Sequence, residues 1–483
     1  MPRIVTTPIA PLVLPDLRLE PRRVAPDVIA AALPGPGRDR LATGPVLAVT
    51  TGQQPGLFTG PLFTVYKGLS AVALARRLER SGGTPVVPVF WVAGDDHDFA
   101  EANHAAFLDG GGDLASVVLR ERPADAPLRP LSREPCGPEI RRALDELRAG
   151  TPETEFKAGM LEWLERCYRP DATLADAFAA ALHALLGSRG LVVLRAYDAQ
   201  AKRAAAPWTL KGLDVTLPDG YTPVFVEAAQ GRDRLERAEQ GGGFVTRRSG
   251  ERFTRADLER IARESPERLS PNVLLRPAIE AALLPTVAYA AGPAELKYLP
   301  DAAALYQVLG EGEGEGGGVT PQRPVPRWAG VIVESRVEKV MERYGFGLEA
   351  LDGKPGELEA RLLREALPPA TLEALAALRR ELAEGYERLG RDVAALDPTL
   401  ERTVQSARNA ALAGTQEIEK KLVASLKREN ETLVRQIARA RVAVYPQGQP
   451  QERVLTLASF LVRYGPDLVD TLDHEVARWA GAS

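Results

Sequence analysis

The sequence predicts an α/β protein in which helices cover both faces of a parallel sheet, with a long antiparallel helical hairpin added to that core. An apolar run at 45–50, a helical pattern at 62–80 and a second apolar run at 85–94 are typical of a βαβ unit. Such strands are apolar along their whole length because both faces of a parallel sheet are buried. A stripe of apolar residues with charges between them over 370–443 indicates the hairpin.

Further runs extend the core. The segments 190–196 and 283–292 are expected to be buried strands, because each is short, apolar and bounded by glycine. The segments 223–228 and 244–248 are expected to be strands of a smaller and more polar substructure. The stretch 311–318, made of glycine and glutamate, cannot bury apolar surface and is expected to be a flexible surface loop.

The length of 483 residues would by itself suggest about three domains. The pattern instead favours one core over 1–369, with insertions at about 105–185 and 205–265. The coiled-coil hairpin follows at 370–443, and a segment at 444–483 returns to the core.

Charge and composition exclude several classes of protein. The formal net charge of −4 provides no basic field for nucleic acid. Cys136 and Cys167 lack the spacing of a disulfide framework or a zinc site, which points to a reducing cytoplasm. The sequence has no apolar run long enough for a membrane span, and its proline-rich start does not fit a signal helix, so neither a membrane protein nor a secreted one is expected.

The hairpin is predicted to turn at Asp397, which would cap the second helix with Pro398 at its first position. A single helix over 398–443 would be roughly 69 Å long, and the first arm about half that. The longer arm would leave part of its apolar stripe uncovered, which favours pairing with another chain. Two ordinary helices packed on the core are the alternative.

A glycine-containing loop joins the first predicted strand to the first helix. In open parallel sheets, ligands bind beyond the carboxyl ends of the strands, where this loop lies. Glycine lets the backbone approach a phosphate, and the next helix could offer free N–H groups. The spacing fits neither the dinucleotide nor the P-loop motif, and a structural turn is the alternative. The candidate nucleotide- or substrate-binding residues are Thr51, Gly52, Gln53, Gln54, Gly56, Thr59, Gly60 and Lys67.

An acidic cluster follows the second strand. Its residues are Asp95, Asp96, His97 and Asp98, with Asn103 and His104 shortly after. Burying so many carboxylates without partners would be costly. We expect the cluster to bind a substrate amine or a ribose hydroxyl, with His97 as the acid–base group beside Asp96 and Asp98. A role in turns and caps is one alternative. A metal site is another, but the histidine spacing matches no standard motif, and no tightly bound metal is expected.

Two later segments could contribute to a site. The first, 269–299, places polar residues at the ends of apolar runs, where they could meet a carboxylate or phosphate: Asn272, Arg276, Glu295 and Tyr298. A packed helix–strand unit without chemistry is the alternative there. The second, 445–454, is a candidate second nucleotide pocket where the hairpin meets the core: Tyr445, Gln451 and Arg453.

Four long strings resemble one family, the BshC enzymes, which add cysteine in bacillithiol synthesis. They are TGQQPGLFTGPLFTVYKGLSA (51–71), PVFWVAGDDHDFAEANH (88–104), SPNVLLRPAIEAALLPTVAYAAGPAELKY (270–298) and YPQGQPQERVLTLASFLVRYGPDLVDTL (445–472). With the hairpin between the last two, the resemblance covers nearly the whole chain. It implies a Rossmann-like core with connecting-peptide insertions, similar in arrangement to class I aminoacyl-tRNA synthetases, and a coiled coil that forms a homodimer.

The resemblance further implies a cytoplasmic ligase that joins L-cysteine to the amine of glucosaminyl-malate, the last step of bacillithiol synthesis. A carboxylate forms an amide in water only after activation, so ATP or ADP is expected, with Mg²⁺ where ATP is used. The stretch 57–60 lacks the histidines of the synthetase motif, and Asp95 stands where the family more often has glutamate. Two other functions stay open: a nucleotidyltransferase for another small acid, and a non-catalytic dimeric binding or scaffold protein.

Overall fold

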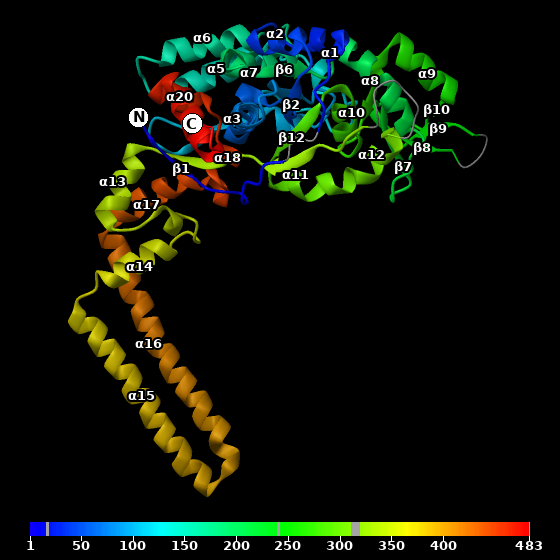
Figure 1. Ribbon diagram of the computed structural model, residues 1–483. Coiled ribbons are helices and arrows are strands. Elements are labelled where there is room, and N and C mark those ends of the chain that lie inside the picture. The colour runs from blue at the N-terminus through cyan, green and yellow to red at the C-terminus, as the bar shows by residue number, and fades with distance from the viewer. Residues whose placement is uncertain (16–18, 239–241, 311–318, 483) are drawn as a thin grey trace. The chain divides into compact units, whose positions relative to one another are not determined.

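The computed structural model describes residues 1–15, 19–238, 242–310 and 319–482 (Figure 1). The chain divides into two compact units, the first formed by Met1–Ile332 with Gln449–Ser483 and the second by Val333–Gly448. The loop predicted at 311–318 lies outside the described residues. Within those residues, no helix has both the length and the apolar character that a bilayer crossing requires.

The first unit is built around a five-stranded sheet whose neighbouring strands are all parallel, as predicted. Its order is β13 (Arg323–Pro326), β12 (Thr286–Ala291), β2 (Leu47–Gln53), β3 (Val86–Val92) and β6 (Val192–Arg195). The four apolar runs that were predicted to be core strands are β2, β3, β6 and β12. The chain continues from β2 to β3 on one side, whereas β12 lies on the other side. A topological switch point therefore separates β2 from β12.

Helices cover both faces of this sheet. Phe90 of β3 points toward α3 (Leu62–Gly82) and α7 (Leu174–Leu186), where its ring centroid lies 6.1 Å from that of Phe178. Val89 and Trp91 point the other way, into a core shared with α1 (Pro26–Ala31), α8 (Ala199–Gly212) and α10 (Leu275–Leu283). Since every residue of β3 is buried, the run is apolar on both faces of the strand.

A second sheet of five antiparallel strands lies beside the first. Its order is β10 (Arg252–Phe253), β9 (Phe244–Thr246), β8 (Gly231–Arg237), β7 (Tyr221–Ala228) and β11 (Leu269–Pro271). β7 and β9 confirm the polar substructure expected at 223–228 and 244–248. The sequence did not predict β8, because most of its residues are charged.

Shorter elements complete the first unit. Two ribbons pair β1 (Arg3–Thr6) with β14 (Gly330–Val333) and β4 (His104–Leu108) with β5 (Leu114–Val118). The other helices are α2 (Pro36–Thr43), α4 (Phe99–Ala102), α5 (Glu139–Gly150), α6 (Lys157–Cys167), α9 (Arg255–Glu264), α11 (Pro293–Tyr298), α12 (Ala303–Gly310), α18 (Gln451–Val454), α19 (Ala458–Tyr464) and α20 (Asp467–Ala480).

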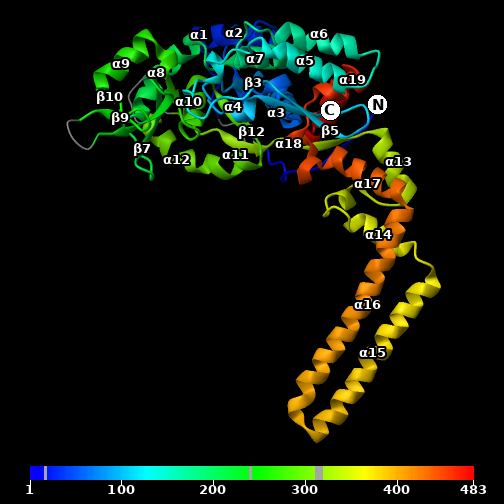
Figure 2. The same ribbon diagram turned by 180° about the vertical axis from the view of Figure 1, so that it is seen from behind.

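The second unit contains the predicted hairpin (Figure 2). α15 (Pro369–Leu396) and α16 (Glu401–Glu429) lie side by side, and the Asp397 carboxylate caps the turn by accepting the Thr399 N–H at 2.9 Å. The prediction of one continuous second arm is wrong. At Asn430 the backbone leaves helical geometry (φ −114°, ψ 41°), and a separate helix, α17 (Glu431–Val444), follows. The Leu426 carbonyl accepts both the Asn430 backbone N–H at 2.9 Å and the Asn430 side-chain amide at 3.0 Å, which fixes this helix end.

The structure groups residues 333–369, which the sequence pattern placed with the core, with the hairpin. Two helices of this stretch, α13 (Ser335–Tyr344) and α14 (Glu357–Glu365), pack on α17. A buried ion pair joins Arg441 of α17 to Glu359 of α14 at 2.9 Å. This contact links segments far apart in sequence, so local pattern does not reveal it.

Candidate functional site

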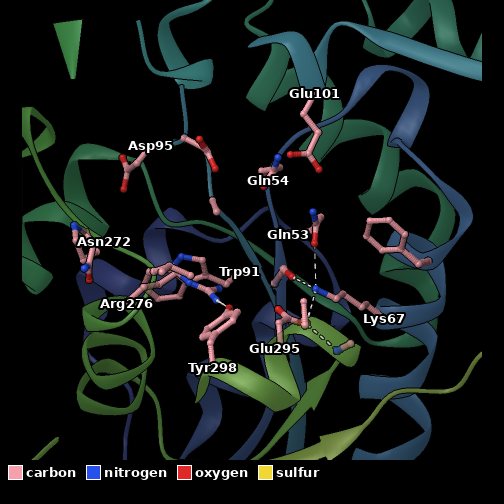
Figure 3. Close-up of a pocket in the computed structure, with 18 of the residues that line it drawn as sticks. Gln53, Gln54, Lys67, Trp91, Asp95, Glu101, Asn272, Arg276, Glu295 and Tyr298 are labelled. Carbon is pink, nitrogen blue, oxygen red and sulfur yellow. Dashed lines mark hydrogen bonds and ion pairs between the residues drawn. The ribbon is translucent and has the colours of Figure 1, made fainter. Parts of the chain in front are cut away.

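A cavity of about 580 Å³ opens at the carboxyl ends of β2 and β12, where the topological switch point lies (Figure 3). Its lining combines the end of β2, the acidic loop after β3, the antiparallel sheet, the start of α10 and the start of α11. Besides the backbone of Gly52, the polar and aromatic lining residues are Gln53, Gln54, Phe63, Lys67, Trp91, Asp95, Asp96, Glu101, Phe225, Arg232, Arg234, Asn272, Arg276, Glu295, Tyr298, Arg327 and Arg453. The structure thus brings together candidates from all four of the segments singled out in the sequence.

Lys67 and Glu295 form a buried ion pair at one end of this cavity. The Lys67 ammonium lies 2.7 Å from Oε2 of Glu295, and it donates to the Gly52 carbonyl at 2.8 Å and to Oε1 of Gln53 at 3.0 Å. Burial lowers the pKa of Lys67, which Glu295 opposes. Burial alone would raise the pKa of Glu295, but Lys67 and Arg276 outweigh it and hold that pKa below its ordinary value. Because all three ammonium hydrogens are used, Lys67 is a structural cation rather than a free phosphate ligand.

Arg276 lies beside this ion pair, and the hydrogen-bond partners of its guanidinium are neutral. In the described part of the chain its hydrogen bonds go to the phenol oxygens of Tyr298 at 3.1 Å and Tyr289 at 3.4 Å. Gly52 makes room for it, since a β-carbon there would lie 3.0 Å from Nη1 of Arg276 and 2.9 Å from the Trp91 carbonyl oxygen. A guanidinium with neutral partners keeps its charge available for an anionic ligand.

Some carboxylates of the acidic loop bind other groups of the protein, and some line the cavity. Asp95 forms an ion pair with buried Lys202 of α8. Oδ1 of Asp96 accepts the backbone N–H groups of His97 at 2.7 Å and Asp98 at 3.1 Å. The Asp98 carboxylate caps α4 by accepting the Glu101 N–H at 3.0 Å. The turn-and-cap alternative therefore accounts for the backbone bonds of Asp96 and Asp98, although Asp96 also lines the cavity.

Contrary to the predicted grouping, His97 does not line this cavity. With Asp98 and Asn103 it lines a separate cavity of about 520 Å³. Its Nδ1 lies 3.2 Å from Nη1 of Arg232, a side chain that does line the first cavity. Burial, followed by the charge of Arg232, lowers the pKa of His97, so the neutral ring accepts this hydrogen bond near pH 7.

His104 also lies outside the cavity. It is exposed at the start of β4, where its Nδ1 is 3.0 Å from the Ala100 carbonyl oxygen. Thr51 points to the opposite side of β2 from Gly52 and donates to the Ala290 carbonyl at 2.8 Å, because successive side chains of a strand alternate.

The glycine loop from Gly56 to Gly60 is held by contacts within the protein rather than open to a ligand. Phe58 and Thr59 adopt left-handed φ angles of 51° and 73°. The Tyr168 hydroxyl accepts the Thr59 N–H at 2.9 Å and donates to the Gly56 carbonyl at 3.1 Å. Gly56, Thr59 and Gly60 are therefore turn residues in this structure, the alternative left open above.

The start of α3 is occupied as well. The Leu62 N–H donates to the Leu455 carbonyl at 2.8 Å, so the C-terminal segment occupies a donor that was predicted to be free for phosphate.

The segment 445–454 is divided between several roles. Gln451 is buried and exchanges two hydrogen bonds with the backbone of Ile332, at 2.8 and 3.0 Å, which makes it a structural link. Glu452 pairs with buried Arg327 at 2.6 Å, and Arg453 lines the 580 Å³ cavity. Tyr445 belongs to the second unit. The structure does not group the three predicted residues into one pocket within either unit.

Several lining residues were not predicted: Trp91, Phe225, Arg232, Arg234 and Arg327. Arg232 and Arg234 lie two residues apart on β8, so they share a face of a strand that the pattern did not show. Arg327 directly follows β13, and the rule that ligands bind at strand ends would have found it once that strand was known.

Groups of three or more His, Cys, Asp or Glu side chains that could hold a metal ion are absent from the part of the chain that the structure describes. Donors suited to phosphate or carboxylate are present in the cavity. In the described chain the exposed Arg453 side chain makes no hydrogen bond or ion pair, and the amides of Gln53 and Gln54 face the same space (Figure 3).

Comparisons with known proteins cover both units. Residues 38–218 and 215–311 match the family described as "Bacillithiol biosynthesis BshC, N-terminal Rossmann-like domain", and residues 330–478 match "Bacillithiol biosynthesis BshC, C-terminal coiled-coil domain". A protein of Salinibacter ruber named "Putative cysteine ligase BshC" is 32% identical over 464 residues, which cover 89% of this chain and 80% of its own.

A protein of Chlorobaculum tepidum with the same name is 30% identical over 479 residues, which cover 90% of this chain and 81% of its own. The two matched domains correspond to the parallel sheet and the hairpin seen in the structure. The chain belongs to the bacillithiol biosynthesis BshC family.

Proposed function

We propose that this protein joins the carboxylate of L-cysteine to the amine of glucosaminyl-malate and so forms bacillithiol. The observation that carries the proposal is the charge layout of the 580 Å³ cavity (Figure 3). It holds the Arg276 guanidinium with neutral partners and, elsewhere on its wall, the carboxylates of Asp96 and Glu101. A substrate with two carboxylates and an ammonium group complements that layout. The name that the relatives carry supports the same reaction class.

Each end of the substrate has a partner in this proposal. Arg276 and Asn272 hold the malate carboxylates, by charge-assisted and amide hydrogen bonds. Asp96 and Glu101 receive the ammonium group, while Asp95 is already neutralised by Lys202. The ammonium nitrogen gives one proton to a carboxylate, and Glu101 is the exposed one of the pair.

The reaction requires an activated cysteine carboxylate, and ATP with Mg²⁺ is the proposed source of that activation. The amine nitrogen attacks the activated carbonyl carbon and a C–N bond forms. The C–O bond to phosphate or AMP breaks, the leaving group keeps the electron pair, and the nitrogen releases its second proton to solvent. Arg453 and the amides of Gln53 and Gln54 are the donors that would stabilise the charge of that leaving group.

His97 has an indirect role in this arrangement. Because its ring accepts from Arg232, it is a positioning residue for a guanidinium that lines the cavity. This replaces the acid–base role predicted from the sequence.

The test is to incubate the purified protein with L-cysteine, glucosaminyl-malate and Mg²⁺–ATP and to detect bacillithiol by thiol labelling and mass spectrometry. Product should require all three small molecules, and the ADP or AMP released identifies the activated species. Arg276→Lys should lower kcat/KM roughly 10- to 100-fold, since hydrogen bonds to charged groups contribute about 1.5–3 kcal/mol. Arg166→Lys, on the exposed surface, is the matched control. A rate for Arg276→Lys or His97→Ala equal to that of wild type would contradict the role given to that residue.

We further propose that the hairpin pairs two copies of the chain. Large apolar side chains remain exposed along it: Leu378 (39%), Leu389 (47%), Leu396 (88%), Leu400 (44%) and Ile418 (50%). Sedimentation analysis should show a dimer that Leu389→Glu combined with Ile418→Glu converts to monomer, whereas Glu381→Gln leaves it unchanged. A wild-type protein that is monomeric at micromolar concentration would refute the pairing.

A further inference from the structure

A buried carboxylate lies one helical turn beyond Arg276 on α10. Glu280 has no exposed surface, and neither of its carboxylate oxygens has a hydrogen-bond partner among the residues that the structure describes. Ionising such a group in the protein interior is costly unless a charge or a donor compensates it. The position i+4 on the same helix places it on the same face as Arg276. Its presence behind a cation of the cavity calls for a physical reason.

Two neutral hydroxyl groups, those of Thr50 and Tyr306, act on Glu280 without satisfying it, and Gln322 lies next to Thr50. The Thr50 hydroxyl of β2 favours the ionised form of Glu280, but its hydrogen bond of 3.4 Å goes to Oε1 of Gln322. The Tyr306 hydroxyl of α12 and Nε2 of Gln322 are buried and lack partners in the described chain. The cluster therefore contains donors that could rotate toward Glu280, yet it leaves the carboxyl group free to gain or lose a proton.

The charged and titratable groups that act on Glu280 come from four other elements besides its own helix. They are Arg276, Lys67, Glu295, Tyr289, Tyr298 and Tyr306. Burial raises the pKa of Glu280 to about 7, against the opposing effects of Arg276, Thr50 and Lys67, while Glu295 adds to the rise. Near neutral pH the carboxyl group is thus poised between its two forms.

We infer that Glu280 is a positioning residue for Arg276, and that an anion which binds Arg276 from the cavity brings a proton onto Glu280. The inference rests on the anion-binding role proposed for Arg276. In the empty cavity an ionised Glu280 compensates the guanidinium from behind. A ligand carboxylate competes for the same charge and repels Glu280. Protonation removes that repulsion, so the protonated form prevails when the anion is bound.

Isothermal titration of the full-length protein with L-malate tests this inference without requiring turnover. Titrations at pH 7 in two buffers of different ionisation enthalpy count the protons taken up. Wild type should take up roughly half a proton per malate, because a group with a pKa of about 7 is half protonated before binding. Between pH 6 and 8, where malate stays fully ionised, the wild-type Kd should rise several-fold. Glu280→Gln should show neither the uptake nor the pH dependence.

Glu162→Gln is the matched control, because it makes a comparable substitution at an exposed carboxylate of α6 that does not line the cavity. It should keep the proton uptake of wild type. Equal uptake in Glu280→Gln and wild type, or malate binding by wild type without uptake, would overturn the inference. Wild type that does not bind malate would remove the anion site and the inference with it.

If Glu280→Gln does not fold, the wild-type pH series decides alone, and a Kd that is flat between pH 6 and 8 refutes the coupling. The ligase proposal fails by a different result. A protein that binds malate with proton uptake but makes no bacillithiol keeps the role of Glu280 and loses the proposed reaction.

Discussion

Replacing Lys67 by methionine should destabilise the first unit by about 3 kcal/mol. The side chains of Lys67 and Glu295 are only 4% and 11% exposed, so water screens their attraction weakly. Breaking a buried pair costs about 3–5 kcal/mol, because one charge stays buried without its partner. Glu295 would keep two hydrogen bonds, from the Gly292 N–H and the Tyr289 hydroxyl, both at 2.7 Å, which favours the lower end of that range.

Urea unfolding at pH 7.5 measures this effect, and a double-mutant cycle with Glu295→Gln isolates the pair. The double variant should be at least about 2 kcal/mol more stable than the sum of the two single losses predicts. Lys67 lowers the pKa of Glu295 in wild type, so its contribution is present above the ordinary pKa of a glutamate and is lost as the pH falls. In Lys67→Met that cation no longer opposes the effect of burial on the pKa of Glu295. The difference in unfolding free energy between wild type and this variant should therefore grow from pH 4 to pH 7.

Lys157→Met is the matched control. Lys157 is comparably buried, but its partner Glu153 is 90% exposed, so its removal leaves no buried charge. We expect this control to lose about 1 kcal/mol or less. A Lys67→Met protein within that same margin, or additive single losses in the cycle, would falsify the assignment of Lys67 as a structural cation.

Three further predictions follow from particular contacts. Gly52→Ala should lower the free energy of unfolding by about 1–3 kcal/mol and weaken ligand binding, because the new β-carbon meets the Trp91 carbonyl and Arg276. Gly44→Ala is the control and should be neutral, because no atom lies within 4 Å of its added carbon. Equal melting temperatures for the two variants would contradict the close approach at Gly52. Glu280→Gln should be more stable than wild type at pH 8, by up to about 3 kcal/mol, and equal to it near pH 4.5. The reason is that a carboxyl whose folded pKa is raised to about 7 loses stability as the pH rises from its unfolded pKa to that value; a difference that does not change with pH would speak against it. Tyr168→Phe should lower the free energy of unfolding in urea by about 2 kcal/mol, because the buried Thr59 N–H loses its acceptor. In the proposed ATP-dependent reaction it should leave the KM for ATP unchanged, and a selective rise in that KM would contradict the assignment of the glycine loop as a structural turn.

Local sequence pattern was sufficient to predict the buried strands and the helical hairpin, because their apolar residues recur in simple patterns. The strands β2, β3, β6 and β12 each contain a short apolar run because they are buried on both faces along nearly their whole length, and such runs can be recognised in the sequence. The hairpin keeps its apolar stripe over many turns and carries a capping residue at its turn, so its first arm and its turn were predicted correctly. The break at Asn430 was not, since one unfavourable residue in a long helical pattern does not by itself end a helix.

Part of the candidate site could also be predicted from the sequence, and part could not. Gln53 and Asp95 lie at or just after the ends of β2 and β3, and the rule that ligands bind there predicted them from the sequence. Arg276 and Glu295 were predicted because polar residues stand at the ends of apolar runs in 269–299. The rule about strand ends says nothing of where a side chain points. His97 follows the end of β3 only two residues after Asp95, yet it faces a different cavity.

The sequence by itself determined the fold class, the hairpin and the family of this protein, because these depend on periodicity and on long strings of residues that are local in the chain. Only the tertiary structure decided which polar groups are free. Lys67, Asp95 and Gly56 find their partners in Glu295, Lys202 and Tyr168, each more than a hundred residues away. A charged group is either paired with another residue or available to a ligand, and the distances between segments remote in sequence decide which. These distances are a few ångströms, and no local pattern encodes them.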